Sequence, residues 1–153
     1  MAAASNVVPS RIRSLLDYAG TRPTGSATRR AVITGTLVIG AALVGATSAI
    51  HLHLWAMGYR DIPTVGPLFL VQGIVGAVLV VALVVVRRLI VVAVAAGFMI
   101  ATIGGLLLSV NVGLFGFMDT LSAPFAGLSL IVEIAGALVL TVAGIALAVG
   151  TPR

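Results

Sequence analysis

Long apolar runs alternate with short polar segments along the chain. Four runs, at residues 31–55, 67–86, 89–110 and 124–149, contain a single acidic residue and no arginine or lysine. At a rise of 1.5 Å per residue, helices of roughly 20 to 26 residues are long enough to cross about 30 Å of hydrocarbon. Lipid offers no partners for backbone polar groups, so each run must satisfy them within one helix. The pattern therefore predicts an all-α integral membrane protein, an antiparallel four-helix transmembrane bundle over residues 31–149.

The composition excludes a water-soluble domain. Of the 153 residues, 60% are hydrophobic and 8% are charged, whereas soluble domains carry about 25% charged residues. The absence of cysteine removes disulfides, thiolate metal sites and a cysteine nucleophile. The net charge of +5 comes from residues at the ends of the apolar runs. We attribute it to membrane topology, and we expect the lipid bilayer, and no nucleic acid, as a partner.

The arginines are distributed unevenly between the two sides of the predicted bundle. They precede the first run, separate the second from the third and end the chain: Arg11, Arg13, Arg22, Arg29, Arg30, Arg87, Arg88 and Arg153. Only Arg60, beside Asp61, falls on the opposite side. Short loops rich in arginine stay in the cytoplasm during insertion. We therefore predict a multi-pass protein of the inner (plasma) membrane with both termini in the cytoplasm, including a basic segment at 1–30 and a tail at 150–153.

The first 30 residues combine basic side chains with a short amphipathic pattern. The apolar core of a secretory signal is about 7 to 15 residues long. The run that begins at Ala31 is longer and is followed by further runs, so we predict no cleaved signal. Ser10 can cap a helix over residues 10–19 that would lie on the anionic inner leaflet. A disordered basic tail is the alternative, and residues 20–28 are typical of a linker.

The chain also resembles itself at an offset of 58 residues. This offset aligns the Arg-Arg pair at 29–30 with the pair at 87–88, and the sequence GYRD at 58–61 with GFMD at 116–119. Each unit would contain two crossings, which predicts two tandem helical hairpins of the same orientation. Chance similarity between apolar helices explains the same matches, so both interpretations stay open.

Small residues recur along one stripe of each of the last two runs. The stripes consist of Ala93, Gly97, Ala101, Gly105 and Ser109 in the third run, and of Ser129, Gly136 and Gly144, together with Glu133, in the fourth. Small residues let helices approach closely in lipid. We predict helix–helix contacts along both stripes, either within the bundle or with a partner subunit.

Glu133 is the one ionisable residue well inside a run. It lies near the middle of the bilayer, where an acidic side chain costs on the order of 2.5 to 3.5 kcal/mol, so we expect it to be neutral, paired or facing a cavity. Gln72 occupies the corresponding place in the other half of the possible repeat. A proton or cation site is the functional interpretation, and a carboxyl group that hydrogen-bonds to a neighbouring helix is the structural alternative.

Two histidines end the first run, in the sequence HLHLW. His51 and His53 lie about 200° apart on a helix and cannot bind one metal ion together unless that end unwinds. The chain has no other histidine, which excludes a haem held by histidines from two helices. Glu133 lies about 14 Å deeper than His51 by helical rise, so we predict no direct pair. The alternative to a site is an interfacial aromatic belt with Trp55 and Tyr59.

The loops on the outer side collect further polar residues. The first, GYRDIPTVGP at 58–67, is rich in turn formers and predicts an ordered turn. The polar residues expected on this side are His51, His53, Tyr59, Arg60, Asp61, Asn111, Asp119 and Ser122. The ends of any four-helix membrane protein collect such groups, and the chain contains no phosphate-binding loop, catalytic triad or zinc motif. We therefore expect no enzyme, no metal and no cofactor.

The sequence HLHLW at 51–55, followed by GYRDIPTVGPLFLVQ at 58–72, resembles small four-span membrane proteins of high-GC actinobacteria. The resemblance covers the first outer loop and its flanks, and elsewhere it extends only to hydropathy. The use of arginine without lysine agrees with a high-GC coding bias. This group is uncharacterised, so the resemblance implies four spans and no particular function.

Three functions are compatible with this sequence. A non-catalytic accessory or scaffold protein, which associates with itself or with a larger membrane complex through its helices, needs the fewest special residues. The alternative is a small proton- or cation-coupled transporter that uses Glu133 in a cavity between the third and fourth runs, with Gln72 opposite. A redox- or quinone-associated subunit that uses His51, His53 and Asp119 is the third.

Overall fold

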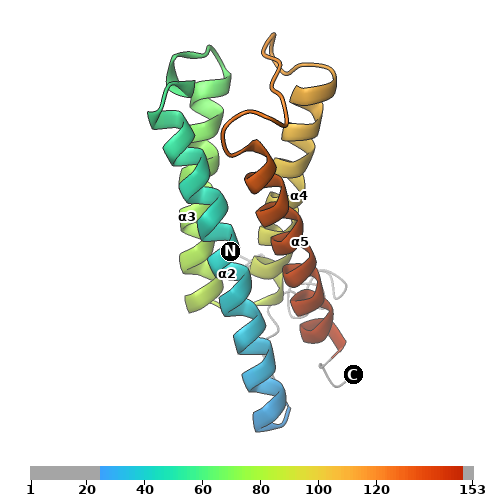
Figure 1. Ribbon diagram of the computed structural model, residues 1–153. Coiled ribbons are helices and arrows are strands. Elements are labelled where there is room, and N and C mark those ends of the chain that lie inside the picture. The colour runs from blue at the N-terminus through green and yellow to red at the C-terminus, as the bar shows by residue number, and fades with distance from the viewer. Residues whose placement is uncertain (1–24, 150–153) are drawn as a thin grey trace, which may run out of the picture.

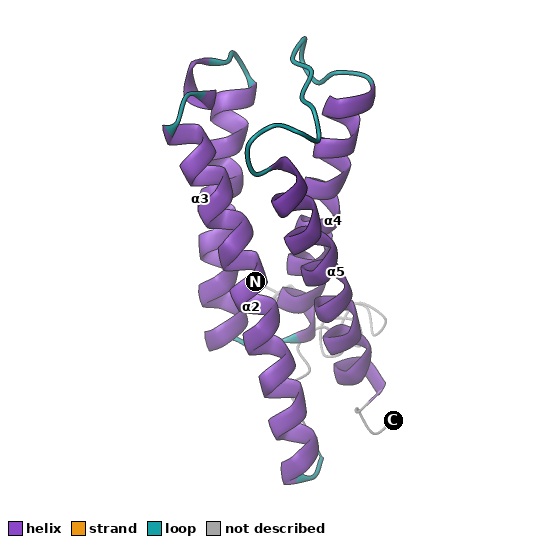
Figure 2. Cartoon of the chain, viewed as in Figure 1, coloured by secondary structure: helices purple, strands orange, loops and turns teal. Residues whose placement is uncertain are grey.

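The computed structural model describes residues 25–149, which form four long helices and one short 3-10 helix (Figure 1). In chain order these are α2 (Ala27–Ala56), η1 (Tyr59–Asp61), α3 (Val65–Val85), α4 (Leu89–Asn111) and α5 (Ala126–Val149). Each of the four long helices is long and apolar enough to cross a membrane. No β-strand occurs between residues 25 and 149 (Figure 2). The predicted all-α four-helix membrane architecture is confirmed, while the helix expected at 10–19 and the tail at 150–153 lie outside the described residues.

The helices begin and end within a few residues of the predicted runs, for local reasons. α2 begins at Ala27 because the Ser26 hydroxyl caps it, accepting the Arg29 N–H at 3.2 Å. Arginines do not interrupt this helix, since their long side chains can extend toward water. α3 includes Pro67 in its first turn, where the missing N–H needs no helical partner. The ordered turn predicted between these helices is present as η1.

The four helices form two antiparallel hairpins, α2 with α3 and α4 with α5. The hairpins pack together mainly through α2 and α5, whereas α3 and α4 contact each other much less (Figure 1). The loops at 57–64 and 112–125 therefore lie at one end of the bundle, which we call the hairpin end. The turn at 86–88 lies at the other end, which we call the arginine end.

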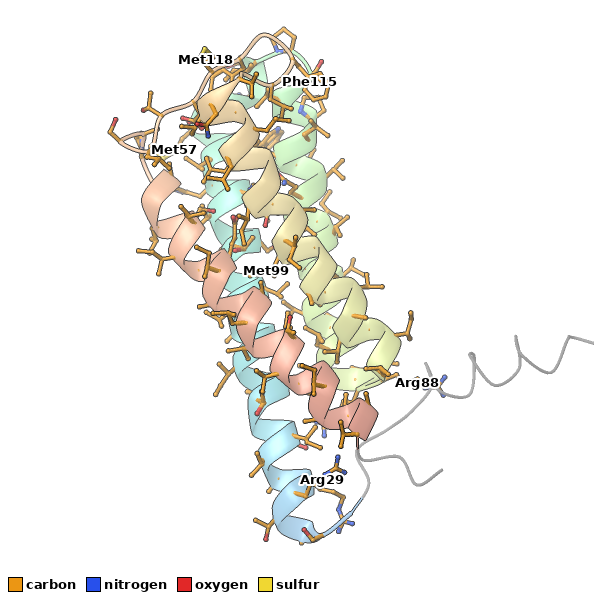
Figure 3. The ribbon with its side chains drawn as sticks, turned by 90° about the vertical axis from the view of Figure 1, so that its right-hand side faces the viewer. Arg29, Met57, Arg88, Met99, Phe115 and Met118 are labelled. Carbon is orange, nitrogen blue, oxygen red and sulfur yellow. The ribbon has the colours of Figure 1, made fainter. Side chains whose placement is uncertain are left out.

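The two ends differ in the side chains that they present. Arg29 and Arg88 lie at the arginine end, and Met57, Phe115 and Met118 lie at the hairpin end (Figure 3). The Arg29 guanidinium donates a hydrogen bond to the backbone oxygen of Ala146, which ties the start of α2 to the last turns of α5. Cationic side chains also interact favourably with the carbonyl end of a helix dipole.

Small residues allow close approach within the first hairpin. A Cβ atom at Gly76 would lie 2.9 Å from the Ser48 Cβ, so this position of α3 admits only glycine without a shift of α2. The Ser48 hydroxyl also donates to the backbone oxygen of Gly73 at 2.5 Å. Close backbone contact and hydrogen bonds between helices are what holds helices together in lipid, where apolar burial gives little.

The arginine half of the bundle contains a closely packed apolar core. Its members come from all four helices: Ile33, Leu37, Ala41, Val44, Leu79, Leu83, Val92, Ala95, Met99, Leu140, Ala143 and Leu147. Val44, Leu83, Met99 and Leu140 are among those that are completely buried. Large apolar side chains such as Val142 also cover the outer surface, as expected for a bundle whose solvent is lipid.

The small-residue stripe of α4, for which contacts within the bundle or with a partner subunit were both predicted, is divided between two surfaces. Ala93, Gly97 and Ala101 are exposed on the outside, whereas Gly105 and Ser109 face inward. Residues four apart on a helix are offset by about 40°, so the stripe turns around the helix along its length. α4 packs on α5 through a different face that includes Val92, Ala95 and Met99. The α5 stripe of Ser129, Glu133, Gly136 and Gly144 faces the bundle interior, which is one of the two alternatives given for it.

Candidate functional site

A cavity of about 170 Å³ lies in the hairpin half of the bundle, between the two hairpins. It is lined from all four helices, from η1 and from the second loop, by His51, Leu54, Tyr59, Val65, Leu68, Phe69, Val71, Gln72, Thr102, Gly105, Leu106, Ser109, Leu114, Phe117, Asp119, Pro124, Ala126, Ser129 and Glu133. Most of this lining is apolar. A few polar groups in an otherwise apolar cavity are typical of a binding site for a small molecule.

Glu133 is the most deeply buried ionisable group of this cavity. Its side chain is 1% exposed, and the Ser129 hydroxyl donates to its Oε1 atom at 2.7 Å. Ser129 precedes it by one helical turn on the same face of α5, so the helix itself positions the donor. Within residues 25–149, the Oε2 atom has no hydrogen-bond partner. Because a buried polar atom without a partner is costly, this atom is suited to bind a proton or a ligand.

Three polar side chains from α3 and α4 share the cavity with Glu133. The Thr102 hydroxyl lies beside the carboxyl group but donates to the backbone oxygen of Met99 at 2.8 Å. The Ser109 hydroxyl is buried and has no partner in the described part of the chain. Gln72 lines the cavity from α3. Polar atoms without hydrogen-bond partners among residues 25–149 therefore lie on the cavity walls as well as at the Glu133 carboxyl group.

The first helix contributes His51, whose ring is largely buried. Its Nδ1 atom lies 2.9 Å from the backbone oxygen of Thr47. A carbonyl oxygen can only accept, so we assign the proton of a neutral ring to Nδ1 and the lone pair to Nε2. The Phe69 ring lies against it, with centroids 5.1 Å apart. His51 and Glu133 line the same cavity, and their side chains hydrogen-bond to Thr47 and to Ser129, each on the residue's own helix.

Aromatic rings from three elements meet at the hairpin end of the cavity. Tyr59 of η1 stacks on Phe69 of α3 with a centroid distance of 4.8 Å, and it meets Phe117 of the second loop edge to face at 5.8 Å. Burial, and then the negative charge of Asp119, raise the pKa of the Tyr59 phenol. The phenol therefore stays protonated and able to donate a hydrogen bond well above neutral pH.

The formal charges that line the cavity are both negative, since the lining contains Glu133 and Asp119 and no arginine. Arg60 lies outside this lining and pairs with Asp61 at 3.8 Å on the surface, where both side chains are more than half exposed. An acidic cavity with apolar walls concentrates cations and disfavours anions. Aromatic rings near its end add a further surface that attracts cations.

The structure brings together five of the residues singled out from the sequence and separates four others. Glu133, Gln72, His51, Tyr59 and Asp119 line one cavity. The four outside its lining are His53, Arg60, Asp61 and Asn111. His53 is exposed and contacts the Phe125 ring at 5.2 Å, on the side of α2 opposite His51. The Asn111 amide donates to the backbone oxygen of Leu107 at 2.7 Å and is exposed.

Sequence reasoning missed Thr102, Phe69 and Phe117 as parts of this site. Thr102 follows Ala95 and Met99 at helical spacing, so the buried face of α4 would have revealed it once that face was known. Phe69 precedes Gln72 by one helical turn on the same face of α3. Nothing in the sequence indicates that the loop carrying Phe117 folds back toward Tyr59.

Between residues 25 and 149 no three or more histidine, aspartate and glutamate side chains gather as metal ligands. Comparison of the chain with known protein families, with curated proteins and with solved structures finds no match.

Proposed function

We propose that this membrane protein binds a small organic cation or a proton in the cavity, and that Glu133 supplies the counter-charge. One observation carries the proposal: a carboxyl group that is 1% exposed keeps one oxygen without a partner, within the described chain, at an acidic cavity. A single hydrogen bond from Ser129 offsets only part of the cost of a charge at this depth. A bound cation or proton would remove the remainder.

The cavity is suited to the coupling or substrate site of a small transporter. With the hairpin end outside, as the arginine distribution predicts, the cavity would face the outer leaflet. The apolar core around Val44, Met99 and Leu140 would separate it from the cytoplasm. Transport would then require this core to open while the hairpin end closes, a movement of one hairpin against the other.

Binding tests the proposal directly. Ligand-observed NMR with ethylammonium is measured on the protein in lipid nanodiscs, with empty nanodiscs as the blank. We expect Glu133→Gln to weaken binding at least tenfold. Asp61→Asn, which removes an acidic group from the exposed surface outside the cavity, should change it by less than twofold. Equal binding by the parent and Glu133→Gln contradicts the proposal.

Transport is tested separately in proteoliposomes loaded with a radiolabelled amine. We expect efflux from vesicles that contain the parent or Asp61→Asn and no efflux above the lipid background with Glu133→Gln. Binding that depends on Glu133 but is not accompanied by efflux overturns the transporter assignment and leaves a cation-binding protein.

A second function is favoured by the outer surface of α4. Ala93, Gly97 and Ala101 are exposed, and a side chain at Gly97 would meet nothing within 4 Å. An accessory or scaffold protein could use this surface to contact another transmembrane helix. We expect Gly97→Leu to dissociate a complex purified in mild detergent, and Gly35→Leu, at an open position on α2, to leave it intact. A solitary monomer from native membranes argues against this function.

A further inference from the structure

We propose that the ligand of this cavity is a lipophilic amine that enters sideways from the lipid, between α3 and α4. The inference rests on the proposed cation site at Glu133 and adds the substrate class and the route of entry. The two hairpins contact each other least on the α3–α4 side of the cavity.

The wall between α3 and α4 is open to the surroundings of the bundle. Leu68 and Val71 of α3 line the cavity, and yet they are 39% and 54% exposed. Residues that line a closed cavity would be buried, so these side chains form the rim of an opening. The α3–α4 contact is also much weaker than the contacts within each hairpin and between α2 and α5.

Gly105 leaves space on the α4 side of the same opening. It lines the cavity, and a Cβ atom at this position would meet nothing within 4 Å. Its neighbour Leu106 lines the cavity as well. The opening is therefore bounded by apolar side chains on one helix and by a glycine on the other, with no ion pair across it among the described residues.

The positions of the charged and apolar groups define the class of ligand. The carboxyl group of Glu133 lies deep in the bundle, and the walls that lead from it to the opening are mostly apolar. An ammonium group can pair with the carboxylate, while an alkyl chain follows the walls and extends into the acyl chains of the bilayer. The mostly apolar walls favour the alkyl chain of such a ligand over the hydration shell of an inorganic cation.

The size of the cavity agrees with a ligand whose ammonium group lies inside it and whose alkyl chain extends into the lipid. A cavity of about 150 Å³ in another protein holds a benzene molecule, so about 170 Å³ has room for an ammonium head and a few carbons. A longer chain must leave the cavity. At the hairpin end the Tyr59 ring contacts both Phe69 and Phe117, which leaves the α3–α4 side as the apolar exit.

Three ligands separate the contributions of charge and chain. Decylamine has both, 1-decanol has the chain without the charge, and ethylamine has the charge without the chain. Calorimetric titrations use the full-length protein in nanodiscs, and partitioning into empty nanodiscs is subtracted. We expect decylamine to bind at least tenfold more tightly than either of the other two, and Glu133→Gln to abolish its preference over 1-decanol.

Two variants test the route from opposite sides. Gly105→Leu fills the α4 side of the opening, and Val71→Phe enlarges an exposed side chain on the α3 side. Each should weaken decylamine binding at least tenfold and ethylamine binding by less than twofold. Gly104→Leu, at an open and exposed position of the same helix outside the cavity lining, is the matched control and should bind decylamine as the parent does. Val71→Phe keeps the test valid if Gly105→Leu does not fold.

Failure of this inference differs from failure of the proposed function. If both amines bind equally, and both lose affinity in Glu133→Gln, the lateral route is wrong and the cation site stands. If Gly105→Leu and Val71→Phe both bind decylamine like the parent, the route is again wrong. If no amine binds in a manner that depends on Glu133, or if decanol binds as tightly as decylamine, the cation site itself is wrong.

Discussion

The same four helices form a closed core in the arginine half of the bundle and a cavity in the hairpin half. In the arginine half, α4 and α5 turn Val92, Met99, Leu140 and Leu147 toward the interior, and all are fully buried or nearly so. In the hairpin half the corresponding faces carry small or polar residues: Thr102, Gly105, Ser109, Ser129 and Glu133. The difference between the closed core and the cavity therefore comes from the size and polarity of the side chains, rather than from a change of the helical backbone.

The largest effect on stability is expected from shortening a side chain in the apolar core of the arginine half. Leu140→Ala removes a completely buried side chain, and we expect the free energy of unfolding to fall by about 2 kcal/mol. That is the lower end of the range for such deletions, because lipid is also apolar and the transfer contribution shrinks. Val142→Ala, on the exposed face of the same helix, is the control. Thermal unfolding in detergent micelles measures both, and equal values for the two variants would contradict the distinction between the halves.

Filling the cavity should raise the stability of the protein instead of lowering it. Ser109→Val replaces a buried hydroxyl that has no partner among the described residues with an apolar group of greater volume. We expect stability to rise by about 1 kcal/mol and amine binding to weaken. The same unfolding and titration experiments record both quantities. A variant that is less stable than the parent shows that the cavity is held by contacts which a valine disrupts.

A smaller change is expected at the contact between α2 and α3. Ser48→Ala removes the hydrogen bond to the backbone oxygen of Gly73. Interhelical hydrogen bonds in membranes contribute about 0.6 kcal/mol on average, so unfolding should shift by roughly that amount. Ser122→Ala, at an exposed loop residue, is expected to produce no shift. A loss of more than about 2 kcal/mol at Ser48 lies outside the measured range of such bonds and would indicate a packing role.

The smallest effect concerns the phenol at the hairpin end. Burial and the Asp119 charge raise the pKa of Tyr59, so the folded state holds this proton more tightly than the unfolded state. Stability is therefore complete below the ordinary tyrosine pKa of about 10 and falls as the pH rises through the folded-state pKa. Asp119→Asn in a Tyr18→Phe background should move the ultraviolet titration of Tyr59 to lower pH. An unchanged titration curve rules out the interaction with Asp119.

The fold followed from the sequence because length and hydropathy alone determine whether a segment crosses a membrane. The four predicted runs match α2, α3, α4 and α5 apart from a few residues at their ends. The differences arise where a cap or a turn decides the boundary, as at Ser26. Arginines at the ends of the runs lowered the apparent length of the first one without interrupting its helix.

The site was only partly predictable, since residue spacing does not reveal which face of a helix turns inward. Glu133 and Gln72, which were expected to share a cavity, both belong to its lining. The α4 stripe from Ala93 to Ser109 could not be assigned to one surface, because spacing by four residues turns it gradually around the helix. The sequence could not show that His51 lines the cavity while Arg60 lies outside it, because this depends on how η1 packs against α3. A Cβ atom at Gly66 would lie 2.6 Å from the Arg60 carbonyl oxygen, so η1 can pack this closely on α3 only because residue 66 is a glycine.

The most direct test of the central claim uses the fact that Glu133 is the one glutamate in the sequence. Protein labelled with ¹³C at the glutamate carboxyl carbon gives a single side-chain resonance from this position, without the need for any substitution. In nanodiscs we expect decylamine to shift that resonance in a saturable manner, while 1-decanol leaves it unchanged. A carboxyl resonance that does not move at decylamine concentrations which saturate the protein would show that Glu133 is not the group that binds the cation.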